Sequence, residues 1–282
     1  MPSLTLLGQS LLSGIFIGAL YGLLGLGLSL TWGLLRQINL AHFALAFLGA
    51  YLTYQLSSAG WDPIATLGLI LPCFFAFGAM THWLFARFSI SPFNSLLVSF
   101  GLTVIVESTI QGIWTADSRR LDSAYTAIRY KVGALYVPFP ELLTLIVAAV
   151  LCISVWAGLR YTELGRAMRA VAEDAPIAAA FGVNERALSL LLSGLSAAFA
   201  GVAGLCLALS FTLAPSQIYS WIGVVFAAVM IGGLGNPIGP LIAGIAIGTS
   251  EAITMALTAP TWAPLVSFSL LIAVLLARAK KI

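Results

Sequence analysis

Charged residues are missing from long stretches of this chain, and their absence constrains the fold more than any other feature. No Asp, Glu, Lys or Arg occurs before Arg36, between Arg36 and Asp62, or from 187 to 250. A helix needs roughly 20 apolar residues to cross the hydrocarbon core of a bilayer, so the last stretch allows more than one crossing. Only 8% of the 282 residues are charged, against about 25% in soluble domains. The chain is therefore predicted to lie in a membrane.

The apolar stretches predict an all-α polytopic transmembrane helical bundle of about eight or nine spans. Backbone groups in lipid must pair within the protein, which leaves helices or a closed barrel. Barrel strands would give short alternating segments, whereas these runs of Leu, Ala, Ile and Gly are long and continuous. No basic residue precedes the first run, so we expect it to stay as a span rather than act as a cleaved signal peptide. The predicted spans are 8–34, 40–58, 63–86, 93–114, 141–159, 188–210, 219–233, 240–258 and 261–277.

Two polar segments, 115–139 and 160–187, interrupt the apolar runs and set the expected orientation. Placing 160–187 in the cytoplasm puts nine of the 13 Lys and Arg residues inside and four outside. Cytoplasmic loops carry the excess of basic residues in membrane proteins. The segment 115–139 is then an external loop, and the N-terminus faces outward.

The segment 160–187 is predicted to form two short helices with defined ends. Glu163 with Arg166, and Arg169 with Glu173, stand at spacings that allow pairing on one helical face. The helix ends are marked by Asp174 as an N-cap, Pro176 in a first turn, Gly182 at a left-handed position and Asn184 as the next cap. The second helix, 175–181, is expected to expose Ile177, Ala178, Ala179, Ala180 and Phe181. Such a face suits insertion into a groove on a partner, although a solvated loop with local caps remains an equal alternative.

Two acids fall inside predicted spans, Glu107 in the fourth and Glu251 in the eighth. A carboxylate in lipid costs at least about 2.5 kcal/mol, so such residues usually face the bundle interior or a water path. Glu107 could contact the ammonium group of an amino-acid substrate, or it could belong to a structural pair near the outer face. For Glu251 a structural role is favoured.

A weak repeat relates the two halves of the chain. A helix dotted with glycines meets a polar break at residues 37–42, and a similar helix meets a break at residues 232–237. Interrupted spans at matching places are the best sequence indication of a transporter's substrate site. Asn39 is expected to cap the span after the first break, with His42 facing that break or packing as a buried histidine. Glycines spaced four apart, at 14, 18 and 22 and at 244 and 248, predict close helix contacts.

Several chemistries lack their sequence signatures. No lysine follows a glycine, so no phosphate-binding loop of the Walker A type occurs and any ATP must bind another chain. No hydrolase motif is present, and the two histidines and three isolated cysteines form no metal-ligand pattern. The net charge of +3 gives no indication of nucleic-acid binding.

Three motifs resemble the LivH-type permeases of branched-chain amino acid ABC importers. The first is Trp32 to His42 followed by residues 48–51, which is similar to that family's Ile-Asn-Phe-Ala-His-Gly region. The second, Gly165 to Asn184, resembles its cytoplasmic coupling loop, and the third, Gly232 to Pro240 with Gly244, Gly248 and Glu251, resembles its Gly-Gly-x-Gly-Ser stretch. Departures at Phe43, Glu107 and Asn236 leave the solute open among branched-chain amino acids, amides, urea and aromatic acids.

The resemblance implies a type II ABC importer-like permease, a single transmembrane domain over 1–282 in the bacterial inner membrane. The implied partners are a second homologous permease, two ATP-binding-cassette ATPases that hold ATP and Mg²⁺, a periplasmic solute-binding protein and membrane lipid. No cofactor is expected on this chain, and it is not itself an enzyme. Substrate-pathway candidates are Asn39, His42, Glu107, Gly232, Gly233, Gly235 and Asn236. Coupling candidates are Gly165, Arg166, Arg169, Glu173, Asp174, Ala178, Phe181 and Gly182.

Two other functions remain open from the residues alone. A secondary transporter could use Glu107 and Glu251 as proton or ion carriers, and a membrane scaffold would need neither. A secondary transporter has no need of a capped docking helix at 175–181, so that segment separates the hypotheses.

Overall fold

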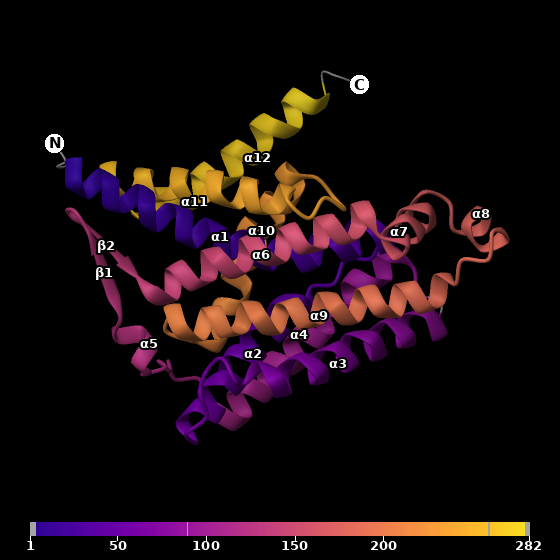
Figure 1. The fold of residues 1–282 in the computed structure, drawn as a ribbon, viewed down its shortest axis with the longest axis horizontal. Helices are drawn as coiled ribbons and strands as arrows, with labels where there is room; N and C mark the ends of the chain where they lie inside the picture. The colour runs from indigo at the N-terminus through magenta and orange to yellow at the C-terminus, as the bar shows by residue number, and fades with distance from the viewer. Residues whose placement is uncertain (1–3, 89, 259, 280–282) are drawn as a thin grey trace.

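A computed structural model describes residues 4–88, 90–258 and 260–279 (Figure 1). Long helices fill most of the described chain, and a small hairpin and several short helices connect them. The helices are α1 (Leu4–Leu35), α2 (Ala41–Ser58), α3 (Leu67–Arg87), α4 (Pro92–Trp114), α5 (Ala124–Ala127), α6 (Phe139–Tyr161), α7 (Glu163–Glu173), α8 (Ala175–Ala180), α9 (Glu185–Ser210), α10 (Ile218–Gly232), α11 (Gly239–Leu257) and α12 (Ala263–Ala279). The strands are β1 (Arg129–Val132) and β2 (Leu135–Pro138), and the 3₁₀ turns are Pro215–Gln217 and Pro260–Trp262.

The predicted membrane-spanning architecture is confirmed. Each of the nine predicted spans overlaps one of the long helices over most of its length. By length and composition, seven helices in the described parts of the chain can cross a membrane. The apolar part of α12 is shorter than this threshold, and α2 is not among the seven. The chain is a multi-pass helical membrane protein.

The polar segments lie at opposite ends of the bundle. In Figure 1 the hairpin and the N-terminal end of α1 are at the left, while α7 and α8 are at the right. The Gln9 side chain exchanges two hydrogen bonds with the backbone of Tyr136, at 2.9 and 3.0 Å, and so ties α1 to β2. Segments on opposite sides of a membrane must be separated in this way.

Helix α1 forms the centre of the fold and packs closely against α11. Both helices place small residues at the contact: Gly14, Gly18 and Gly22 on α1 face Leu241, Gly244 and Gly248 on α11. A Cβ atom added at Gly18 would lie 2.5 Å from the carbonyl oxygen of Gly244. The two backbones therefore touch directly, which is how helices associate in lipid without a hydrophobic driving force. The predicted role of these glycines is confirmed.

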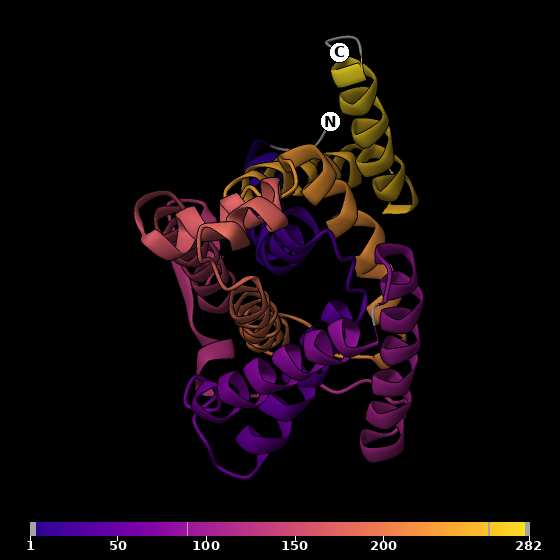
Figure 2. The ribbon, with the colours of Figure 1, turned by 90° about the vertical axis from the view of Figure 1, so that its right-hand side faces the viewer.

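A second group of helices, α2, α3 and α9, packs beside α1 by the same device. Gly204 on α9 contacts the backbone of α2 at Ala46 and Ala50, and Gly78 on α3 contacts the α9 backbone at Ser193. Tyr51 is completely buried in this group, and its hydroxyl donates to the carbonyl of Leu213 at 3.2 Å. In the end-on view of Figure 2, α4 and α12 lie at the edge of the molecule. Helix α4 packs mainly on α2, and α12 on α10 and α11.

The connections differ from the sequence analysis in one boundary and add one hairpin. The third span begins at Leu67 rather than 63, because the Asp62 carboxylate accepts from the amides of Ile64 and Ala65 and holds the intervening residues in a turn. Within the segment 115–139, for which no secondary structure was predicted, β1 and β2 pair antiparallel with Arg129 opposite Pro138. Gly133, at φ +62°, supplies the left-handed residue of the hairpin turn.

We predict that Gly18→Ala destabilises the protein, while Gly101→Ala on the open face of α4 does not. A methyl at Gly18 must push two backbones apart, which costs roughly 1–3 kcal/mol. Nothing lies within 4 Å of a Cβ at Gly101, and alanine favours a helix by up to about 1 kcal/mol there. The thermal midpoints of the purified variants in one detergent measure the difference. Equal midpoints would show that the α1–α11 contact is not tight.

Candidate functional site

The second polar break of the predicted repeat packs against the last two turns of α1. Gly233 and Gly235, in the link between α10 and α11, have φ of +96° and +75°. The Gly235 amide lies 3.1 Å from both the carbonyl and the hydroxyl oxygen of Ser29, and that hydroxyl donates to the carbonyls of Gly233 and Asn236 at 3.4 Å. Ser29 thus satisfies backbone groups that the interrupted helix leaves unpaired.

Close backbone approach fixes the same junction. A Cβ at Gly33 would collide with the backbone of Gly235, and one at Gly232 would collide with Gly239. The Asn236 side chain accepts from the amide of Ile238 at 3.1 Å and so orders the entry into α11. The predicted pathway residues Gly232, Gly233, Gly235 and Asn236 therefore form one turn packed on α1.

Asn39 and His42, the predicted pathway residues of the first break, lie apart from this turn. The Asn39 side chain accepts from the amide of Ala41 at 3.1 Å, at the start of α2. His42 is 2% exposed, and its Nε2 donates to the carbonyl of Leu24 at 3.0 Å. The expectation that His42 faces the break is wrong, because Gly27 on α1 has no side chain and leaves room for the imidazole ring. The alternative of a buried packing histidine describes its position.

Glu107 lies inside α4 on a face that the bundle covers only in part. Its carboxylate accepts from the hydroxyl of Tyr219 on α10 at 2.6 Å and from the side-chain amide of Gln111 at 3.1 Å. Glu107 is half-buried and Gln111 is exposed. An ionisable group on such a face of a membrane helix requires a polar partner or water against it. Tyr219 was not predicted, since a lone tyrosine in an apolar run carries no signal of its partner.

Glu251 has a different environment, fully inside the bundle. The carboxylate accepts from the hydroxyl of Tyr21 at 2.9 Å and from the hydroxyl of Ser267. These residues come from α1 and α12, while Glu251 belongs to α11. Both carboxylate oxygens are therefore engaged in holding three helices together, in keeping with the favoured structural role.

The segment α7–α8 has the caps that the sequence predicts. Asp174 accepts from the amide of Ile177 at 3.0 Å, Asn184 accepts from the amide of Ala187 at 3.0 Å, and Gly182 has φ +85°. Arg166 pairs with Glu163 at 3.5 Å. The possible Arg169–Glu173 pair is not formed between those two described side chains. Gly165 is buried where α7 turns back over Gly158, leaving no space for a Cβ.

The exposed side of α8 differs from the predicted face in one residue. Phe181 is 84% exposed and Ile177 is 57% exposed, but Ala178 is only 4% exposed. The amide of Val183 bonds the Ala178 carbonyl at 3.2 Å, and this turn folds Ala178 inward. The apolar surface that α8 offers to the surroundings therefore consists of Ile177, Ala179, Ala180 and Phe181.

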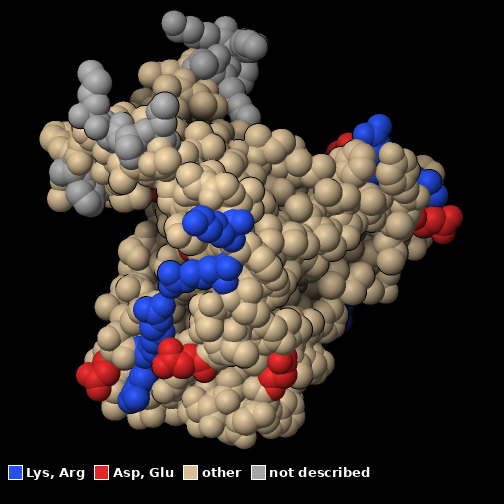
Figure 3. All heavy atoms as spheres, turned by 60° about the vertical axis from the view of Figure 1, so that its left-hand side comes forward, with Lys and Arg blue, Asp and Glu red and all other residues tan. Residues whose placement is uncertain are grey.

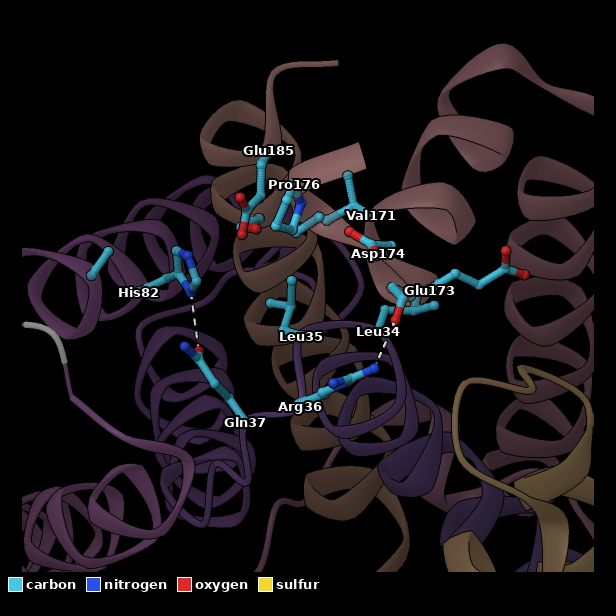
Figure 4. Close-up of a pocket in the computed structure, with 14 residues that line it drawn as sticks. Leu34, Leu35, Arg36, Gln37, His82, Val171, Glu173, Asp174, Pro176 and Glu185 are labelled. Carbon is cyan, nitrogen blue, oxygen red and sulfur yellow. Dashed lines mark hydrogen bonds between the residues drawn. The ribbon is translucent and has the colours of Figure 1, made fainter. Parts of the chain in front are cut away.

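A cavity of about 530 Å³ lies beneath this segment (Figure 4). The link between α1 and α2 forms one side of it, and the junction of α7 with α8 forms the other. Figure 4 shows Glu173, Asp174 and Glu185 around it, with Arg36 below. Sequence analysis did not predict this cavity, although Arg36 and Gln37 belong to the first of the family motifs.

The opposite end of the molecule carries both basic and acidic side chains. Figure 3 shows Lys and Arg side chains gathered in a band on the end that carries the hairpin. The Tyr125 hydroxyl in α5 donates to the Asp62 carboxylate at 2.7 Å. This hydrogen bond, with the two backbone amides on Asp62, lowers the pKa of Asp62 below its ordinary 3.8 and raises the pKa of Tyr125.

Comparison with known proteins identifies the family. The profile described as branched-chain amino acid transport system / permease component matches residues 10–275. The chain belongs to this family.

Three relatives extend over nearly the whole chain. It is 26% identical to the high-affinity branched-chain amino acid transport system permease protein LivH of Escherichia coli K12 over 95% of the chain and 92% of the relative. It is 24% identical to BraD of Pseudomonas aeruginosa, a protein of the same description, over 99% and 96%. It is 28% identical to a probable LivH of Methanocaldococcus jannaschii over 88% and 81%. No solved structure matches the chain.

The lowered pKa of Asp62 gives a pH prediction for the permease. A carboxylate whose folded pKa is depressed stabilises the fold above its unfolded pKa, and this contribution disappears as the pH falls through the folded value. We expect α5 to stay docked from neutral pH down past 3.8 and to loosen below it. Tyr125→Phe should loosen α5 already at neutral pH. A spin label on a cysteine introduced into α5, with Cys73 replaced by Ser, reports this mobility as the pH is lowered. Identical mobility-against-pH profiles for the wild type and Tyr125→Phe would contradict the assignment.

Proposed function

We propose that this chain is the membrane-spanning subunit of an ATP-driven importer and carries branched-chain amino acids or related small polar solutes. The family match and the names of the relatives support the solute class. The observation that carries the ATP-driven mechanism is the capped segment α7–α8, which extends from one end of an otherwise apolar bundle (Figure 1). The proposed location is the bacterial inner membrane, with α7–α8 in the cytoplasm.

Two ATP-binding-cassette ATPases are the proposed partners of this segment, and they hold ATP and Mg²⁺. Phe181 and Ile177 are apolar side chains exposed beyond the membrane-spanning part of the bundle. A large aromatic flanked by small residues fits a groove on a partner and supplies most of the contact energy there. A secondary transporter driven by an ion gradient would leave this exposed apolar helix without a role. ATP binding would close the ATPases, and α8 would pass that motion to the spans by alternating access.

The proposed solute pathway runs along the face where α4 meets α10. The Glu107 carboxylate of α4 and the Tyr219 hydroxyl of α10 meet there. The exposed residues of α4 around them include Phe100, Val104 and Ile105. A second, homologous permease would cover this face, so that Glu107 contacts the ammonium group of the solute. A periplasmic solute-binding protein would deliver the solute to the end that carries the hairpin. The glycine turn around Gly233 to Asn236 then acts as the hinge of the interrupted helix.

The docking proposal predicts which proteins co-purify with the permease. The wild-type chain should bring down an ATP-binding-cassette ATPase. Phe181→Glu should lose that ATPase and reduce uptake by more than about tenfold, as expected for one central interface residue. Arg186→Glu adds an acid at a neighbouring exposed position outside α8 and serves as the control. The readouts are affinity purification followed by mass spectrometry, and uptake of radiolabelled solute in cells.

The outcomes separate the hypotheses clearly. Loss of the ATPase only in Phe181→Glu, with normal insertion of the chain in the membrane, supports docking on α8. If uptake and co-purification are unchanged in Phe181→Glu, α8 is not the docking helix. If no ATPase accompanies the wild-type chain, the ATP-driven mechanism itself is refuted.

The pathway proposal predicts a change in apparent affinity for Glu107→Gln. The substitution keeps the side-chain shape but removes the charge that would face an ammonium group. The KM for uptake in the reconstituted complex should rise about tenfold, which is the effect expected when one hydrogen bond to a charged group is lost. Tyr219→Phe is the matched variant, because it removes the structural partner of Glu107 but keeps the carboxylate. Unchanged kinetics in Glu107→Gln would reduce Glu107 to a structural residue.

A further inference from the structure

Arg36 connects the link after α1 to the end of α7. Its Nη2 atom donates to the carbonyl of Ala172 at 3.2 Å (Figure 4). Ala172 stands in the last turn of α7, where carbonyls have no partner within the helix. Helix C-termini favour positive charge, yet the last turn of α7 has no basic residue and Glu173 and Asp174 follow there. The guanidinium of Arg36 supplies this charge from a distant part of the sequence.

The backbone at Arg36 is unusual as well. Its φ is +54°, and among the described non-glycine residues only Thr115 also has a positive φ. Side chains with a Cβ disfavour this left-handed region, whereas glycine adopts it freely. Such conformations persist only where the surroundings over-determine them. The hydrogen bond to Ala172 is a stabilising interaction that Arg36 makes from this left-handed conformation.

The same link is held from the other side of the cavity. Gln37 Oε1 accepts from the imidazole Nδ1 of His82 on α3 at 3.1 Å, and His82 is 8% exposed. Figure 4 shows these two hydrogen bonds on either side of the cavity of about 530 Å³. Residues 36 and 37 therefore join α7 to α3 through the end of α1.

Contacts continue from this link into the second interrupted helix. Gly33, in the last turn of α1, packs against the backbone of Gly235. Ser29, one turn further back, bonds the same turn through its carbonyl and hydroxyl oxygens. Helix α10, which ends at this turn, carries Tyr219. A displacement of the end of α1 must therefore move the α10–α11 link.

We propose that Arg36 is a positioning residue that transmits displacement of α7–α8 to both interrupted helices. The inference rests on the proposed function, because it assumes that an ATPase pushes α8. It adds a specific connection: α8 follows directly on α7, the C-terminus of α7 is held by Arg36, and Arg36 sits on the end of α1. Without the guanidinium, α7 is held to α1 only by apolar packing of Leu34 and Leu35 against Met168 and Val171, and displacement of α7 moves α1 less. ATP hydrolysis then continues with little solute movement.

The experiment uses the complete permease–ATPase complex in proteoliposomes and measures ATP hydrolysis and solute uptake in parallel. Arg36→Gly removes the side chain and relieves the left-handed backbone, so the variant is expected to fold and assemble. We expect the ratio of solute carried to ATP hydrolysed to fall about tenfold, as for one lost charged hydrogen bond. Arg36→Lys keeps the charge and should restore part of the ratio. Arg87→Gln, which removes an exposed arginine at the same end of the bundle, should leave it unchanged.

The readout distinguishes this inference from the function on which it rests. A normal ratio in Arg36→Gly, or equal losses in Arg36→Gly and Arg87→Gln, would overturn the role of Arg36 while leaving ATP-driven uptake intact. Absence of ATP-dependent uptake in the wild-type complex would instead refute the proposed function. If Arg36→Gly does not assemble, Arg36→Gln is measured instead, because it removes the charge and keeps a side chain at this left-handed position. Its ratio of solute carried to ATP hydrolysed then decides the question.

Discussion

Direct backbone contact between α1 and α11 is the constraint on which the rest of the structure depends. In lipid there is little hydrophobic gain from bringing two helices together, so association relies on close packing and on hydrogen bonds. Glycines at 14, 18 and 22 against 244 and 248 provide this packing along the middle of α1. With α1 fixed against α11, the glycine turn before α11 meets the end of α1, and Ser29 is positioned to bond its backbone. The junction of the two interrupted helices follows from this one contact.

Polar groups inside the bundle fall into two kinds, which the structure separates by their surroundings. Glu251 and His42 are enclosed, and other helices supply their hydrogen-bond partners. Glu107 has a partner in Tyr219, but it stands on a face that the bundle covers only partly. Buried polar groups with complete partners stabilise a fold, whereas a half-covered carboxylate in a membrane span still has an open side that a ligand or water can reach. This contrast is the physical reason for placing the solute pathway at the α4–α10 face.

Through Arg36, the end of α1 contacts the segment proposed for ATPase docking on one side, and through Gly33 it contacts the turn of the second interrupted helix on the other. Closely packed backbones transmit displacement because they have no slack to absorb it. The chain belongs to a family of transport permeases. Under the proposed function, this arrangement would carry a force applied to α8 into the spans.

The order and approximate bounds of the long helices could be predicted from the sequence, because the lack of charge over each stretch leaves a membrane helix as the stable state. It also determined the caps at Asp174 and Asn184 and the close approach at the glycine repeats, since these depend on local spacing. Tertiary structure decided what each break contacts. The inward turn of Ala178, the packing of His42 on α1, the partner of Glu107 and the reach of Arg36 to Ala172 join residues far apart in the chain. Local periodicity carries no record of such distant pairings, so only the folded chain could reveal them.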